Sequence, residues 1–351
     1  MAIRRQQIAI CVLATLVGHG AAEGVITPEL EVSGDHFTVD SQPRFLVFVS
    51  YFDAMRASDE TLESDFRYLR ANGFDGIRIF PNWWDFRREI AFGGDTLLNG
   101  KGQIRLERFS ALERILELAA QHGLLVDVSF AYETVLGLSN LTEQQVGTSQ
   151  GLLPVNQVRL DDYEHALFYV AGGLRDYRHI FLDIQNEYNG RITHLSDDEV
   201  RRLRAAIKNA DPHRLVTASL ANEIGPEEVA RRSNEVNVDI VGWHESRNPW
   251  QFDAMDALVK RARGATTKPI YMGEPALLED GLTVESVITA VTKAKAGGAA
   301  AWTFHTRNGF DLSKQSLVES MTEPERRFAE TFKPKLDATP WGANVAAKVA
   351  E

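Results

Sequence analysis

The chain has 351 residues, of which 44% are hydrophobic and 25% are charged, and it contains a single cysteine. This composition excludes a disordered chain, a collagen-like repeat and a disulfide scaffold. The formal net charge of −11 gives no support to binding of nucleic acid or of an anionic membrane surface, so we expect a neutral or cationic partner.

Residues 1–22 have the order of a secretory signal peptide. Arg4 and Arg5 precede an apolar run over 8–17, and small residues follow at 20–22. The run is too short to span a bilayer. A buried N-terminal helix is the alternative, although the run has no polar face to turn to water. We predict cleavage near Ala22 and a secreted or periplasmic protein.

The next residues predict a short hairpin followed by a barrel. Residues 30–45 form short alternating segments around two turns, which is typical of a β-hairpin. Eight apolar runs then alternate with amphipathic helices, at 45–51, 76–80, 124–130, 180–186, 215–220, 238–244, 269–274 and 299–304. No Gly-x-Gly-x-x-Gly follows the first run, so the pattern favours a closed (β/α)8 TIM barrel over a doubly wound α/β sheet.

Helix signals support this division of the chain. Capping boxes begin at Ser196 and Thr322, and two apolar stripes end at Gly73 and Gly123. No linker rich in Pro or Ser divides the chain, so we predict one catalytic domain over 23–337. The segment 132–156 is expected to be a long loop over the active-site face, and 338–351 a poorly ordered tail.

Two of the predicted strands end in a glutamate, Glu187 on the fourth and Glu274 on the seventh. Active sites of such barrels lie at the carboxyl ends of the strands, and these two strands lie across the mouth from each other. Alternation points Glu187 into the barrel together with Asp183, and Glu274 also if Tyr271 packs outward. A protonated and an ionised carboxyl facing one substrate suit cleavage of a glycosidic bond. For either glutamate alone, a helix cap or a surface ion pair is the alternative.

The segments Asn186-Glu187 and Gly273-Glu274-Pro275 resemble the clan A glycoside hydrolases, particularly the cellulase-like family 5 enzymes. The resemblance covers the barrel from the hairpin to Trp302. It implies a retaining mechanism in which Glu187 is the acid/base and Glu274 the nucleophile. It also implies that Asn186 holds the 2-hydroxyl of the sugar whose glycosidic bond is cleaved.

Two further residues fit the resemblance. Arg78 matches the clan's arginine near the nucleophile, where a fixed cation keeps that carboxylate ionised. An ion pair inside the barrel with Asp127 or Asp183 is the alternative. His244 ends the sixth strand, where the family places a His or Tyr that hydrogen-bonds the nucleophile, and a purely structural histidine is the alternative.

Four aromatic residues are candidates for sugar binding. Trp302 ends the eighth strand, where the family has a tryptophan under the cleaved sugar, and a buried core Trp is the alternative. Trp83 and Trp84 follow the second strand in an exposed loop, and we expect one of them to line a subsite. Tyr132 follows the third strand, which often ends in a histidine in the family.

The sequence also departs from the family pattern. Tyr188 follows Glu187 where family 5 usually has a proline, and Glu245 follows His244 in place of the usual His-x-Tyr. These departures leave the identity of the substrate open. They also leave Glu133 and Glu245 as alternative candidates for the catalytic carboxylates.

No metal-ligand spacing, phosphate-binding loop or Gly-x-Ser-x-Gly elbow is present, so we expect neither a metal nor another cofactor. The sequence predicts a secreted retaining β-glycoside hydrolase, a monomer that acts on a neutral poly- or oligosaccharide without nucleic-acid or membrane partners. Two alternatives remain open. One is a glycan-binding barrel that has lost turnover, and the other is a transglycosylase that passes the sugar to another sugar.

Overall fold

The computed structural model describes residues 27–82, 95–99, 101–131, 158–190, 195–221, 224–245, 249–275, 278, 281–306 and 308–342. The predicted signal peptide, the loop over 132–156 and the site candidates Trp83, Trp84, Tyr132 and Glu133 lie outside these residues.

Eight parallel strands form the barrel in the order β8-β7-β6-β5-β4-β11-β10-β9, and an isolated parallel bridge between Leu220 and Trp243 joins its two ends. The predicted (β/α)8 barrel is confirmed, and each of the eight apolar runs contains a strand. The strands are β4 (Leu46–Ser50), β5 (Gly76–Ile79), β6 (Leu125–Ser129), β7 (Ile180–Asp183), β8 (Leu215–Thr217), β9 (Val241–Trp243), β10 (Ile270–Met272) and β11 (Ala301–Phe304).

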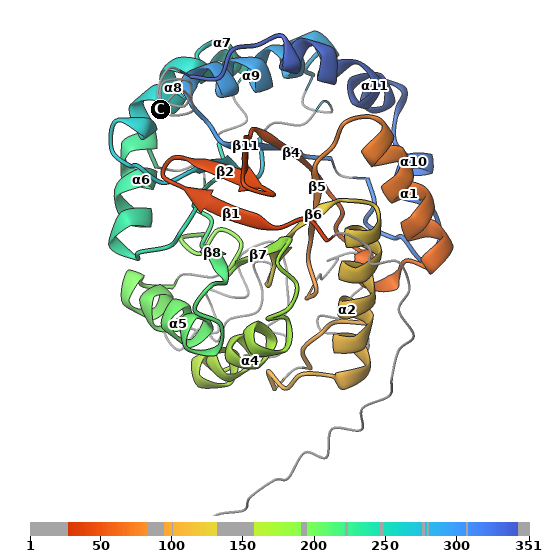
Figure 1. Ribbon diagram of the computed structural model, residues 1–351, viewed down its shortest axis with the longest axis vertical. Helices are drawn as coiled ribbons and strands as arrows, with labels where there is room; N and C mark the ends of the chain where they lie inside the picture. The colour runs from red at the N-terminus through yellow and green to blue at the C-terminus, as the bar shows by residue number, and fades with distance from the viewer. Residues whose placement is uncertain are drawn as a thin grey trace, which may run out of the picture.

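Helices surround the strands as an outer ring (Figure 1). Both predicted capping boxes are present, from Ser196 to Glu199 and from Thr322 to Glu325. The described helices are η1 (Ala54–Arg56), α1 (Asp59–Ala71), α2 (Leu106–Gln121), α4 (Leu160–Gly173), α5 (Asp197–Ala210), α6 (Pro226–Glu235), α7 (Pro249–Asp253), α8 (Met255–Arg263), α9 (Val284–Gly297), α10 (Leu317–Ser320) and α11 (Glu323–Asp337). Among the described residues, no helix has both the length and the apolar character needed to cross a membrane.

Strand alternation divides the core into two parts. Along β4, Val47 and Val49 belong to the large cluster between the strands and the helices, whereas Leu46 and Phe48 belong to a smaller cluster inside the barrel. The inner cluster also contains Phe181 and Tyr271, whose rings both pack edge-on against Phe48. Apolar side chains therefore fill the lower part of the barrel, and the polar side chains of Arg78, Asp127 and Asp183 lie above them toward its carboxyl end.

A small antiparallel sheet closes the amino end of the barrel, and Figure 1 shows β1 and β2 crossing the barrel axis. The sheet has three strands, β1 (Leu30–Ser33), β2 (His36–Val39) and β3 (Gln42–Arg44), in the segment where the sequence predicted a short hairpin. Phe37 is fully buried and stacks on Phe181 at a centroid distance of 6.2 Å. The sheet thus continues the inner cluster and seals it from water.

Residues 338–342, which follow α11, pack against the barrel through Trp341. Trp341 packs edge-on against Phe45, and its Nε1 donates to the carbonyl of Ala299 at 2.8 Å. Residues 338–342 are therefore packed on the barrel, unlike the tail that the sequence predicted, and 343–351 lie outside the described residues.

The Phe37→Ala substitution tests the sealing role of the sheet. Removing a fully buried phenylalanine should lower the free energy of unfolding by about 3–5 kcal/mol, because the protein loses the free energy of burying the ring and also has to maintain a cavity in its place. Urea unfolding followed by circular dichroism measures this. Phe168→Ala is the matched control, because Phe168 is 50% exposed on α4 and its loss should cost within about 0.5 kcal/mol. Equal effects of the two substitutions would show that Phe37 does not seal the core.

Candidate active site

The site is organised around the guanidinium of Arg78, which points from β5 into the barrel and is only 1% exposed. Its Nη1 donates to Glu274 Oε1 at 2.6 Å, and its Nη2 donates to Asn186 Oδ1 at 2.6 Å. Burial alone would lower the pKa of Arg78, but Glu274 and Asp127 together raise it well above the ordinary value. Arg78 is therefore a permanent buried cation that fixes two side chains from opposite sides of the barrel mouth.

The same guanidinium also contacts two aspartates beneath the mouth. Its Nε lies 3.0 Å from Asp127 Oδ2, and its Nη2 lies 3.4 Å from Asp183 Oδ2. The sequence offered contact with the nucleophile candidate and an ion pair inside the barrel as alternatives for Arg78. The structure shows both together, because one guanidinium has enough donors for all of these partners.

Glu274 reaches the mouth by a route other than the one that alternation predicted. Tyr271 points into the barrel, where its hydroxyl donates to Asp127 Oδ2 at 2.9 Å, and Ile270 and Met272 belong to the outer cluster. The expectation that Tyr271 packs outward is wrong. Strand β10 ends at Met272, so the side chain of Glu274, at a residue exposure of 7%, is directed by the turn that follows the strand.

Glu187 is also positioned by a turn, because β7 ends at Asp183 and does not extend to Glu187 as predicted. Glu187 has φ of +50°, a left-handed conformation that non-glycine residues adopt at a cost of about 1–3 kcal/mol. Ser219 Oγ accepts a hydrogen bond from the Glu187 amide at 3.1 Å and thereby holds the turn. The turn lets the adjacent residues Asn186 and Glu187 both serve the mouth, which an extended strand would not allow.

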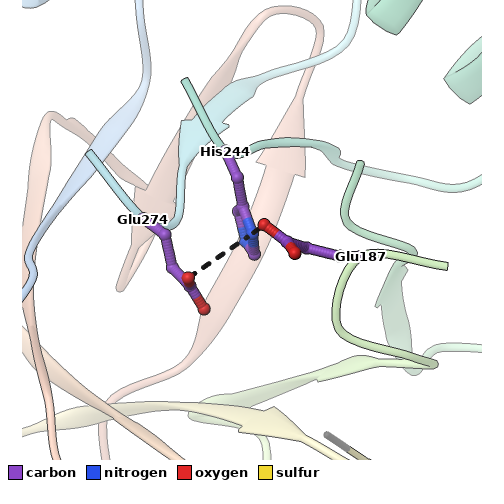
Figure 2. A group of neighbouring side chains, drawn as sticks. All are labelled: Glu187, His244 and Glu274. Carbon is purple, nitrogen blue, oxygen red and sulfur yellow. Dashed lines mark hydrogen bonds and ion pairs between the residues drawn. The ribbon is translucent and has the colours of Figure 1, made fainter. Parts of the chain in front are cut away.

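His244 lies between the two glutamates (Figure 2). Its Nδ1 is 3.0 Å from Glu187 Oε1 and 3.9 Å from Glu274 Oε2. The sequence placed His244 against the predicted nucleophile, but its closer partner is Glu187. A Cβ at Gly273 would lie 2.8 Å from His244 Nε2, so only glycine at that position leaves room for the ring.

The geometry of the two carboxyl groups restricts the chemistry. Glu187, Glu274 and His244 each offer one oxygen or nitrogen atom, and these atoms all lie within 4.8 Å of one another. Retaining glycosidases have carboxyl groups about 5–5.5 Å apart, and inverting enzymes need about 6.5–9.5 Å to admit a water molecule. The nearest oxygens of the pair are thus closer together than the separation that an inverting enzyme needs.

The same three residues do not fit a metal ion well. A histidine that binds a metal usually donates its second ring N–H to an acceptor, but Nε2 of His244 has no hydrogen-bond partner in the described part of the chain. The Arg78 guanidinium bonded to Glu274 would also repel a divalent cation. We therefore derive no step through a metal.

The structure changes the set of aromatic candidates. Trp302 is fully buried in the outer cluster and pairs in register with Val47, so it is the core residue that the sequence kept as the alternative. The prediction that it lies under the cleaved sugar is wrong, because alternation along β11 turns it toward the helices. Phe52 and Phe80, which stack at 4.9 Å, follow β4 and β5 at the mouth, but both are buried.

His305 was missed by the sequence analysis. It follows β11, and its Nδ1 lies 2.9 Å from Ser50 Oγ at the end of β4. Its ring packs edge-on against Phe52 at 5.7 Å. The ring that the eighth strand presents at the mouth is thus that of His305, and not that of Trp302.

Comparisons with known proteins identify the fold. No protein-family model and no curated protein matches the sequence. A family 5 glycoside hydrolase from Bacteroides vulgatus is 12% identical with a TM-score of 0.63, over 89% of this chain and 72% of that one. A β-mannanase from the blue mussel Mytilus edulis is 17% identical with a TM-score of 0.53, over 85% and 98%. The chain has the fold of these glycoside hydrolases.

Two further solved structures agree. A family 5 mannosidase from Rhizomucor miehei, with the substitution E301A, is 13% identical with a TM-score of 0.61, over 89% of this chain and 98% of that one. A second Bacteroides vulgatus protein is 12% identical with a TM-score of 0.64, and this chain spans 63% of its length. The likeness confirms the resemblance to clan A at the level of the fold.

The rival carboxylate Glu245 follows β9 next to His244. It is 1% exposed, and neither of its carboxyl oxygens has a hydrogen-bond partner in the described part of the chain. Burial raises the pKa of Glu245 to about 8. Glu245 is therefore neutral at neutral pH, and it does not belong to the group formed by Glu187, His244 and Glu274.

The Glu245→Gln substitution tests this assignment through stability. Since the pKa rises on folding from 4.5 to about 8, the wild type loses stability as the pH increases between these values, because the folded state holds a proton that the unfolded state has released. The variant lacks this group, so its free energy of unfolding should not fall in this way. The difference between the variant and the wild type should grow by on the order of 3–5 kcal/mol between pH 4.5 and about 8. Urea unfolding at a series of pH values measures it.

Glu330→Gln on the surface of α11 is the control, and its stability should parallel that of the wild type at every pH. If Glu245→Gln also parallels the wild type, Glu245 is not a buried neutral carboxyl.

Proposed function

We propose that the chain is a retaining β-glycoside hydrolase that cleaves a neutral β-linked poly- or oligosaccharide. The observation that carries the proposal is the pair of carboxyl groups on opposite strands, with oxygens within 4.8 Å of each other and one of them bound to a buried arginine. Exported barrels of this kind act on extracellular or periplasmic glycans, so the proposed signal peptide over 1–22 is consistent with it.

The environments of the two glutamates differ, and this difference assigns their roles. Glu274 accepts from a permanent cation and is ionised for nucleophilic attack. Glu187 has a more exposed side chain, at 19%, and within the described part of the chain it pairs with the imidazole of His244 rather than with an arginine. Glu187 is therefore the group that carries a proton and exchanges it with the leaving group and with water.

The reaction proceeds in two displacements. Glu274 attacks the anomeric carbon with an electron pair while the glycosidic C–O bond breaks, and Glu187 gives its proton to the departing oxygen. In the second step Glu187 takes a proton from water, and the water oxygen displaces Glu274 from the sugar. Both steps invert the anomeric carbon, so the product keeps the β configuration.

Asn186 is placed to hold the sugar during both steps. Its Oδ1 accepts from Arg78, and its Nδ2 is buried without a hydrogen-bond partner in the described part of the chain. This amide orientation leaves Nδ2 free to donate to the 2-hydroxyl of the sugar bound to Glu274, a contact that strengthens as the transition state forms. Because the mussel and Rhizomucor structures are named as a mannanase and a mannosidase, β-mannans are the first substrates to test.

Chemical rescue tests the two roles. Glu187→Ala should lose on the order of 10²–10⁴-fold in rate on substrates with poor leaving groups, and far less on an activated aryl glycoside. Added azide should accelerate the second displacement and give a β-glycosyl azide. Glu274→Ala lacks the nucleophile, so an activated leaving group should not restore it, and any azide product should have the α configuration. Rates on β-mannans, β-glucans, xylans and aryl glycosides, with NMR of the azide products, measure this.

Each other outcome has a distinct meaning. Glu330→Ala, a substitution of an exposed glutamate, should behave as the wild type. The reverse rescue pattern would exchange the roles of Glu187 and Glu274. Transfer of the sugar to an added acceptor sugar in preference to water would indicate a transglycosylase. Glycan binding without turnover in the wild type would indicate a silent binding barrel and contradict the proposal.

A further inference from the structure

The buried charges under the barrel mouth do not balance. Arg78 is the cation, and three carboxylates contact its guanidinium, from Asp127 on β6, Asp183 on β7 and Glu274 after β10. Their side-chain exposures are 0%, 1% and 8%. If all three were ionised, the site would hold two uncompensated negative charges out of contact with water, which is costly at low dielectric.

Asp127 is the most enclosed of the three carboxylates. Its Oδ2 lies 3.0 Å from Arg78 Nε and accepts from the Tyr271 hydroxyl at 2.9 Å, while its Oδ1 lies 3.3 Å from Ser129 Oγ on the same strand. Tyr271 is in turn 2.7 Å from Thr303 Oγ1 on β11. Oδ2 accepts from Tyr271 and forms an ion pair with Arg78, whose Nε donates its hydrogen to Ser129 Oγ at 2.8 Å. Oδ1 contacts the Ser129 hydroxyl, whose oxygen can accept a second hydrogen bond.

The charged groups that face Asp127 come from four other strands. Arg78 on β5 and His244 after β9 favour its ionised form, and Asp183 on β7 opposes it. Tyr271 on β10 favours the ionised form through its hydrogen bond. Burial is the largest influence, and the pKa of Asp127 is raised to about 7. A raised pKa of Asp127 agrees with the excess of three carboxylates over one guanidinium around Arg78.

We propose that Asp127 is a positioning residue of the nucleophile, which holds a proton on Oδ1 and thereby leaves the charge of Arg78 to Glu274. The proton on Oδ1 is donated to Ser129 Oγ, and Ser129 Oγ can donate onward to Asp183 Oδ2, 3.5 Å away. This arrangement satisfies every contact of Asp127 and removes one of the excess charges. The proposal rests on the proposed function, since it concerns how the nucleophile is kept ionised.

The proton also links the site to pH. Above neutral pH Asp127 releases it, and the new negative charge competes with Glu274 for Arg78. Asp127 should therefore influence only the alkaline side of the dependence of rate on pH.

The Asp127→Asn variant tests the proposal, because asparagine has the shape of a protonated aspartate, with an oxygen for Arg78 and Tyr271 and an N–H for Ser129. On the acidic side kcat/KM should stay within about threefold of the wild type. The alkaline limb should move to higher pH, because asparagine has no proton to release near neutral pH and so does not compete with Glu274 for Arg78. Ionised Asp127 would give the opposite result, a large loss of kcat/KM at acidic pH, because Asn would remove a counter-charge of Arg78.

A measurement without substrate separates this proposal from the proposed function. Infrared difference spectra recorded below and above about pH 7 should show a buried carboxylic-acid C=O band that is lost on the alkaline side and is weaker in Asp127→Asn. Buried Glu245 contributes a similar band in both proteins, so the part of the band that Asp127→Asn removes is the test. Loss of part of the band in Asp127→Asn would support the proposal even if no substrate is found, and an unchanged band would overturn it even if the protein is an active glycosidase.

Asp75→Asn is the matched control. Asp75 is also buried, at 5% exposure, and lies 3.2 Å from Arg44, but it precedes β5 at the opposite end of the barrel. This variant should leave both limbs of the rate profile unchanged. A shift of the alkaline limb in Asp75→Asn as well would show that the effect is a general consequence of losing a buried carboxyl, and would contradict a special role for Asp127.

Discussion

The structure of the site depends on one buried guanidinium. Arg78 crosses the inside of the barrel from β5 and binds Glu274 on one side and Asn186 on the other, each at 2.6 Å. A cation sealed in a barrel is stable only with carboxylates around it, and those carboxylates must then be ordered by further donors such as Ser129 and Tyr271. The polar layer under the mouth follows from this requirement. The apolar layer below it, closed by the N-terminal sheet, keeps water from reaching the layer from the other end.

Both glutamates are presented by irregular backbone that follows a short strand. Glu187 has φ of +50°, and its turn is held by Ser219, while Glu274 follows Gly273, whose lack of a side chain admits the ring of His244. Rigid strands therefore supply the anchors, and strained turns supply the reacting groups. Strain at such positions is tolerated because the surrounding hydrogen bonds fix the turn, and it orients the carboxyl groups before a substrate binds.

Hydrophobic periodicity and the strand ends were sufficient to predict the barrel and to bring Glu187 and Glu274 to one mouth. The contact of Arg78 with Glu274 was expected from the resemblance to the clan. Prediction from the sequence failed where backbone conformation decides the outcome. The strand β7 ends before Glu187, and Tyr271 points into the barrel, opposite to the alternation considered for the seventh strand. Trp302 is turned toward the helices. Asp127 was named only as a possible partner of Arg78, since the burial of a charge inside a barrel becomes evident only when neighbouring strands are paired.

Trapping of the covalent intermediate tests the central claim most directly, namely that Arg78 maintains Glu274 as an ionised nucleophile opposite the proton donor Glu187. A 2-fluoro glycoside with a good leaving group slows the second displacement, so the sugar remains on the residue that attacked. Mass spectrometry of the digested protein should find the label on Glu274 in the wild type and no label in Glu274→Gln. A label on Glu187 or Glu245, or a wild-type product of inverted configuration without any label, would contradict the account.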